Sequence, residues 1–120
     1  MPRSYLESVL TGACPSFAEQ WTAFRRAHPA GDEPTADDLL ASLQAHVEER
    51  LAEGRVTDVV RLFYTVERLL GEADPILRDL LEEHFLVPLA ATCQAIGVDA
   101  RLAVPHLGPR SRAAWDRGWR

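Results

Sequence analysis

Hydrophobic residues recur at helical spacing through most of the chain and are densest between residues 56 and 70. In that stretch the apolar positions cover about half of a helix circumference, which is wider than the roughly 100° stripe of a surface helix. A helix this apolar must contact neighbours on more than one side. The pattern therefore predicts a central helix near residues 56–70, lined by Val56, Val59, Val60, Leu62, Phe63, Val66, Leu69 and Leu70.

Two helices are expected in the N-terminal part of the chain. Residues 3–11 place their apolar side chains on one side of a short helix that Gly12 ends. Ser16 is followed three residues later by Glu19, a spacing typical of a capping box that opens a second helix. Pro29 ends that helix, and the loop after it is rich in proline, glycine and acids.

The third predicted helix is amphipathic and has an acidic exterior. It begins after Thr35, a favourable N-cap residue, and Gly54 follows its last turn. Its apolar face holds Ala36, Leu40, Leu43, Val47 and Leu51. Its opposite face carries the acids Asp37, Asp38, Glu48, Glu49 and Glu53. This exterior is either an ordinary solvated surface or a surface that binds a partner.

The C-terminal half contains two helix starts and one interruption. Asp74 followed by Pro75 is an N-cap residue before a proline at the first helical position. Pro88 lies inside the helix that follows, and because proline has no backbone N–H it predicts a kink or a break there. The Gly-Pro pair at 108–109 opens a last short helix that carries Trp115.

These elements together predict an all-α fold. No stretch shows the strand alternation of a sheet over a useful length. We expect one domain over residues 1–120, a bundle of about five to seven helices in which successive antiparallel pairs resemble helical-repeat packing. The ends, residues 1–12 and 117–120, are expected to fray.

The composition is that of an ordinary globular protein. Hydrophobic residues make up 47% of the 120 residues and charged residues 26%, which argues against intrinsic disorder. No apolar run approaches the roughly 20 residues of a membrane span, and the first residues have no signal-peptide core. We therefore expect a cytoplasmic protein. Cys14 and Cys93 are isolated in the sequence, so unpaired thiols are expected in that reducing compartment.

Charge is unevenly distributed along the chain. Residues 1–99 hold 17 acids and 8 arginines, a net charge of −9, whereas residues 100–120 hold 5 arginines and one acid, a net charge of +4. The acidic body disfavours nucleic-acid binding, because phosphate contacts need a cationic surface. The basic tail interleaves its arginines with Trp115 and Trp119, so it either contacts nucleic acid by stacking or lies against the acidic body.

Two polar residues fall on or beside apolar helical faces. Glu67 lies at the edge of the apolar arc of the central helix, and His84 lies among leucines on the apolar side of its own helix. A buried carboxylate is costly unless it is paired. We therefore predict that Glu67 and His84 are structural buried polar residues, with Glu67 bonded to an arginine, to His84 or to a helix-end donor.

Residue spacing indicates neither catalysis nor metal binding. No nucleophile or second carboxylate is placed to complete an acid–base site with Glu67. The tight groupings of potential metal ligands are His46 with Glu49 and the segment 82–84. Neither group has the Glu-x-x-His spacing of di-iron bundles or the His-Glu-x-x-His spacing of zinc proteases. We expect no catalytic residue, no metal and no cofactor.

A set of packing and capping positions from the central helix onward carries a family resemblance. These positions are Phe63, Val66, Glu67, Leu69, Leu70, Asp79, Phe85, Leu86, Leu89, Leu107, Gly108, Pro109, Arg110 and Ser111. The sequence here resembles a family of small, uncharacterised, all-helical bacterial proteins, some of which occur among the immunity genes of polymorphic toxin systems. That family usually has an acidic residue after its Phe-Leu pair, where this chain has Val87 and Pro88. The resemblance implies a bundle that acts by binding another protein, and it transfers no catalytic residue.

The leading functional hypothesis is a non-enzymatic protein-interaction module, such as an immunity-type inhibitor of a bacterial toxin. Its acidic surface would meet a basic or neutral protein partner, with Asp37, Asp38, Glu48 and Glu49 as the predicted contact residues. One alternative is an oligomerising structural or adaptor subunit, and another is a small ligand-binding helical bundle. Neither membrane binding nor nucleic-acid binding is expected.

Overall fold

A computed structural model describes residues 3–27 and 34–120 of the chain, and helices dominate that part. The α-helices are α1 (Arg3–Ala13), α2 (Pro15–Ala27), α3 (Ala36–Ala52), α4 (Val60–Glu72), α5 (Pro75–Leu81), α6 (Val87–Ala95) and α7 (Pro109–Gly118). Shorter turns are η1 (Val56–Asp58), the π-helical η2 (Glu82–Leu86), η3 (Ala100–Leu102) and η4 (Val104–His106). The described residues form no strand, and the all-α prediction is confirmed.

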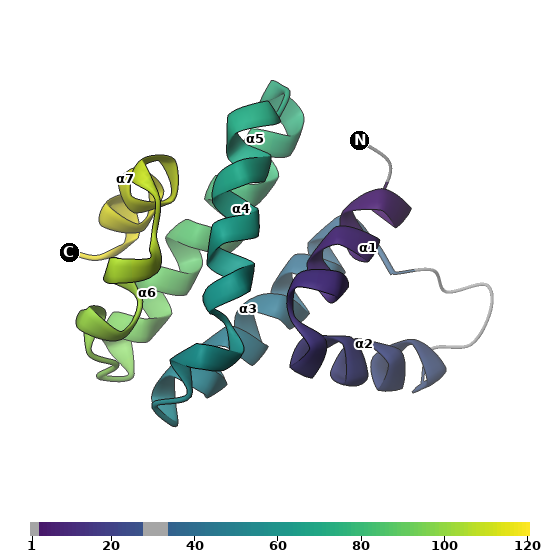
Figure 1. The fold of residues 1–120 in the computed structure, drawn as a ribbon, viewed down its shortest axis with the longest axis horizontal. Coiled ribbons are helices and arrows are strands. Elements are labelled where there is room, and N and C mark those ends of the chain that lie inside the picture. The colour runs from purple at the N-terminus through teal and green to yellow at the C-terminus, as the bar shows by residue number, and fades with distance from the viewer. Residues whose placement is uncertain (1–2, 28–33) are drawn as a thin grey trace.

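Helix α4 runs through the middle of the molecule, with α1 and α2 on one side of it and α6 and α7 on the other (Figure 1). It contacts α1 and α7 directly, while α3 contacts α2, α6 and η2. Its apolar side chains Leu62, Phe63 and Val66 are completely buried. The prediction of a central helix is confirmed, although residues 56–58 form the separate turn η1 before it.

Most predicted helix starts in the described chain follow the capping chemistry of the sequence. Thr35 caps α3: its Oγ1 accepts from the N–H of Asp38 at 3.1 Å, and its own N–H donates to Asp38 Oδ2 at 2.8 Å. Asp74 caps α5 by accepting from the N–H of Leu77 at 2.8 Å, with Pro75 first in the helix. These contacts satisfy N–H groups that lack a partner inside the helix.

The predicted capping box of Ser16 and Glu19 is wrong. Helices α1 and α2 are separated by Cys14 alone, and α2 begins at Pro15, so that Ser16 already lies inside its first turn. The Ser16 hydroxyl is hydrogen-bonded to His46 of α3 instead. The Ser16 hydroxyl, which the local spacing predicted to cap α2, therefore bonds to a residue of a different helix.

Pro88 produces the expected interruption in the form of a π-helical turn. The N–H of Val87 donates to the carbonyl of Glu82, five residues back, and α6 begins immediately with Pro88 in its first turn. The wider turn shifts the helical phase, so a projection at 100° per residue misplaces the side chains within it. His84 is consequently exposed, with 47% of its side chain accessible, and the prediction that it is buried is wrong.

The basic tail lies against the acidic body. Arg117 of α7 forms ion pairs with Glu82 at 2.7 Å and Glu83 at 2.5 Å. Trp119 is half-buried and stacks on Trp115, with ring centroids 5.8 Å apart. Residues 117–120, which we predicted to fray, are thus held in place by charge and by aromatic packing. At the other end of the chain, residues 1–2 lie outside the described part.

Candidate functional site

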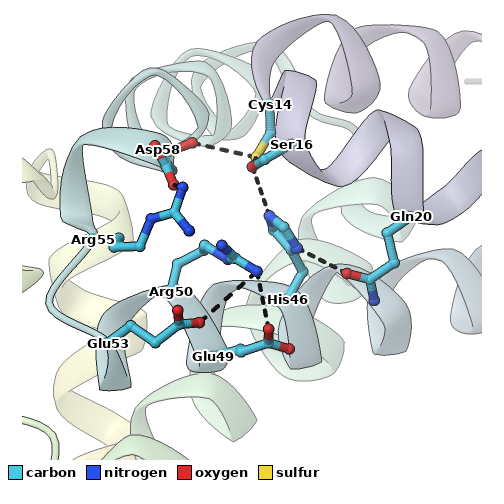
Figure 2. Close-up of polar contacts among 9 residues, drawn as sticks. All are labelled: Cys14, Ser16, Gln20, His46, Glu49, Arg50, Glu53, Arg55 and Asp58. Carbon is cyan, nitrogen blue, oxygen red and sulfur yellow. Dashed lines mark hydrogen bonds and ion pairs between the residues drawn. The ribbon is translucent and has the colours of Figure 1, made fainter.

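A polar network centred on the buried His46 joins α2 to α3 (Figure 2). The His46 side chain is only 1% exposed, and both of its ring nitrogens are engaged. Nε2 lies 2.7 Å from Ser16 Oγ, and Nδ1 lies 2.9 Å from Gln20 Oε1. The ring also packs against Phe17, with centroids 5.8 Å apart. We call Ser16, Gln20 and His46 the His46 network.

The hydrogen bonds of the His46 network fix the direction of each donor. The Gln20 amide is oriented with its carbonyl oxygen toward His46, and because that oxygen can only accept, Nδ1 carries the proton in this arrangement. Nε2 then accepts from the Ser16 hydroxyl. Burial, reinforced by the nearby Arg50, lowers the pKa of His46, and the imidazole is held in its neutral form.

A second group of contacts connects the corner between α1 and α2 to η1. The Cys14 thiol donates to the backbone carbonyl of Asp58 at 3.5 Å. The Asp58 carboxylate pairs with Arg55 at 2.8 Å. Arg50 lies beside this group and pairs with Glu49 and Glu53 (Figure 2). Together with the His46 network, these contacts fix α1, α2, α3 and η1 relative to one another.

Ser16, His46 and Gln20 stand in the order nucleophile, base and orienting group. In such an arrangement the orienting group also stabilises the imidazolium that forms when the serine loses its proton. Gln20 is neutral and cannot do this as a carboxylate would. Sequence reasoning missed the network because His46 lies 30 residues from Ser16, and it tested His46 only as a metal ligand with Glu49. No cluster of three or more His, Cys, Asp or Glu within the described ranges could hold a metal ion.

Glu67 of α4 caps the start of α7. Its Oε1 accepts from the N–H of Ser111 at 2.9 Å, and its Oε2 lies 3.4 Å from both the N–H and Nη1 of Arg110. Burial raises the pKa of Glu67, but these hydrogen bonds outweigh burial and the net shift is downward. Gly108 makes the approach possible, because a Cβ at that position would overlap the Glu67 side chain. The partners of Glu67 are thus a helix-end donor and an arginine, and not His84.

An open groove of about 540 Å³ lies between α1 and α4. We call it the α1–α4 groove. Its α1 wall consists of small or half-buried residues, and its α4 wall carries two arginines, an exposed tyrosine and a threonine. The lining residues are Ser8, Val9, Gly12, Ala13, Arg61, Tyr64, Thr65 and Arg68.

The charges on the α1–α4 groove are not balanced inside the molecule. No described acid lies within 4.0 Å of Arg61 or Arg68, so neither takes part in an ion pair there. A neighbouring groove of about 400 Å³ between α1 and α2 is also lined by two arginines, but one of them, Arg25, is paired with Glu7 at 2.8 Å. Tyr64 is 58% exposed between the two arginines of α4.

The comparison with protein families gives a match over almost the whole chain. A model for a domain of unknown function, DUF7674, matches residues 8–120. The chain belongs to the DUF7674 family. Neither a curated protein nor a solved structure matches it. The His46 network, the Glu67 cap and the α1–α4 groove all lie within the matched residues.

The acids predicted to bind a partner are largely engaged within the DUF7674 fold. Asp37 Oδ1 lies 3.3 Å from Nδ1 of His84, which also approaches Asp79, and Asp38 completes the cap of α3. Glu48 accepts from Gln44 at 2.7 Å, and Glu49 pairs with Arg50 at 2.9 Å. Asp37, Asp38 and Glu49 are exposed and Glu48 is half-buried. All four acids lie on one helix, α3, and each has one oxygen engaged by a partner inside the molecule.

Substituting Glu67 with alanine should destabilise this DUF7674 protein by about 1–2 kcal/mol, because it removes an acceptor for the first N–H groups of α7. Chemical denaturation monitored by circular dichroism would measure the change. Glu72→Ala is a matched control on the same helix, since Glu72 is exposed. Equal stability of the two variants would contradict the capping role.

Among the helices in residues 3–27 and 34–120, none is both long enough and apolar enough to cross a lipid bilayer.

Proposed function

We propose that this DUF7674 protein is a non-enzymatic protein-binding module that uses the α1–α4 groove as its binding surface. The observation that carries the proposal is the pair of exposed arginines, Arg61 and Arg68, which have no described acid partner and flank the exposed ring of Tyr64. Tyrosine and arginine are enriched among the residues that dominate binding energy at protein interfaces. A groove that offers both is suited to another protein.

The state of the His46 network supports the non-enzymatic part of the proposal. Its hydroxyl, imidazole and amide groups are hydrogen-bonded to one another, and His46 is buried. Groups arranged in this way stabilise the contact between α2 and α3. Covalent labelling of Ser16 by a fluorophosphonate probe would contradict this assignment and would favour a hydrolytic enzyme.

The resemblance to proteins found among toxin-immunity genes supports a more specific proposal. In this proposal the module is an immunity-type inhibitor that binds a bacterial toxin in the cytoplasm. The alternative is an oligomerising or adaptor subunit, in which a second copy of the chain occupies the groove. The two differ in the identity of the molecule that contacts Tyr64.

Site-specific photo-crosslinking would test the proposal. A photoreactive phenylalanine analogue replaces Tyr64 in the groove or, as the control, Ala91, which is exposed on α6. Both proteins are expressed in the native host, and their adducts are identified by mass spectrometry. We expect a defined protein adduct from position 64 and none of the same protein from position 91.

Each outcome of the crosslinking experiment separates the hypotheses. A toxin encoded beside this gene, captured at position 64, would support the inhibitor. A dimer of the chain itself would favour the oligomerising subunit. Equal capture at both positions, or capture at position 91 alone, would show that the α1–α4 groove is not the binding surface.

A further inference from the structure

We infer that the partner segment that occupies the α1–α4 groove is an amphipathic helix with an acidic face. This inference rests on the proposed protein-binding function and adds the chemistry of the partner. It is carried by the charge of the groove, by the spacing of its arginines and by the small residues of its α1 wall.

The charge of the groove runs against that of the whole protein. The chain has 18 acids, 13 basic residues and a net charge of −5. Even so, no described acid lines the groove, and Glu7 of α1 and Asp58 of η1 pair with Arg25 and Arg55, which lie outside its lining. Other arginines held in ion pairs are Arg50, Arg101, Arg110, Arg112 and Arg117. The α1–α4 groove is therefore a local basic site on an acidic protein, and it complements a partner with carboxylates.

The arginine spacing matches that of a helix. Arg61 and Arg68 are seven residues apart on α4, which places them on one face and about 10 Å apart along the helix axis. Carboxylates two turns apart on a partner helix have the same separation. Tyr64 and Thr65 lie between the arginines and offer a partly apolar contact surface to the rest of that helix.

The α1 wall allows a helix backbone to come close. Ser8, Gly12 and Ala13 have small side chains, and the space beside Gly12 is open, because no atom lies within 4 Å of a Cβ built there. Exposed Tyr5 falls on the same face of α1 as Ser8 and Gly12, one turn before the first residue of this wall. The groove thus runs along about two turns of each helix, the length of a helical recognition segment.

Selection from a library provides the test. The probe is a phage-displayed library of amphipathic helical peptides of about 16 residues, with the exposed positions randomised. Peptides selected on the wild-type protein are sequenced, and their affinities are measured by fluorescence anisotropy. We expect enrichment of Asp and Glu at positions one or two turns apart, together with binding that weakens as salt is raised.

Three variants locate the binding site. Reversing both charges with Arg61→Glu and Arg68→Glu should lower the affinity for the selected peptides by about tenfold or more. Arg78→Glu is the matched control, because Arg78 is exposed on α5 and lies outside the groove. This variant should bind the selected peptides as the wild type does. Gly12→Leu should also abolish binding by filling the groove, while the open space at Gly12 lets the protein fold normally.

The outcomes separate this inference from the proposed function. Selected peptides without acid enrichment, or binding that the double reversal leaves unchanged, would overturn the acidic-helix inference. The protein could instead bind single-stranded DNA or RNA more tightly than the selected peptides, with an affinity that falls as salt is raised and is lost in the Arg61→Glu, Arg68→Glu variant. That result would overturn the acidic-helix inference in favour of nucleic acid. In either case a specific protein adduct at position 64 would leave the proposed protein-binding function standing.

Discussion

Replacing Trp115 with alanine is expected to lower the free energy of unfolding by about 3–5 kcal/mol, the largest loss we predict for a single side chain. Trp115 is 1% exposed and stacks on Trp119 with an interplanar angle of 15°. It lies on α7, which contacts α4, α6 and η2. Removing the Trp115 side chain leaves a cavity where α7 packs against α4, α6 and η2. It also releases residues 117–120, because the exposed ion pairs of Arg117 are too weak to hold them alone.

Urea denaturation followed by far-ultraviolet circular dichroism would measure this loss. Arg112→Ala is the control on the same helix, because its ion pair with Asp116 is exposed and should contribute less than about 1 kcal/mol. Loss of similar size in both variants, or a small loss for Trp115→Ala, would mean that α7 is not anchored by its tryptophan.

Replacing His46 with alanine is expected to lower the free energy of unfolding by about 2–3 kcal/mol near pH 8, since it leaves a cavity beside Phe17 and removes the partner of the half-buried Ser16 hydroxyl. His46→Gln is the milder comparison, because its amide can replace part of the lost hydrogen bonding. A His46→Ala variant as stable as the wild type would mean that the network holds little of the contact between α2 and α3.

The same residue should make stability depend on pH in a defined direction. Burial lowers the pKa of His46 in the folded state below its ordinary value of 6.5, so the unfolded chain takes up the proton first as the pH falls. The stabilisation from neutral His46 is fully present above about pH 6.5 and is lost below it, as the pH approaches the folded-state pKa. Denaturation would be measured near pH 8 and at about pH 5.5. Between these two pH values the free energy of unfolding should fall more for the wild type than for His46→Gln. Identical losses would exclude His46 as the titrating group.

These stability tests concern a different part of the molecule from the α1–α4 groove. His46 of α3 faces α2, whereas Arg61 and Arg68 of α4 line the groove between α4 and α1. Variants of Arg61, Arg68 and Gly12 should therefore change binding without changing the pH dependence of unfolding. This separation allows binding and stability to be measured independently in one protein.

Local patterns were enough to predict much of this fold. The apolar arc over residues 56–70 placed the central helix, and the short-range signals at Thr35 and Asp74 placed two helix starts correctly. Such signals act over three or four residues and need no distant partner. The same reasoning also indicated that Glu67 needs a hydrogen-bonding partner, because the cost of burying a carboxylate applies in any fold.

The candidate sites depended on contacts that no local pattern contains. Ser16 meets His46 across 30 residues and Glu67 meets Ser111 across 44, so the partners could be named only after the helices were placed. The π-helical turn at 82–86 moved His84 to the surface by shifting the helical phase. The binding groove arises where α1 and α4 come together. The sequence alone determined which segments are helical and, outside the π-helical turn, most of their apolar faces, since both follow from neighbours on one helix. Only the tertiary structure decided which polar groups find a partner and that Arg61 and Arg68 line a groove without one, because that depends on distances between separate helices.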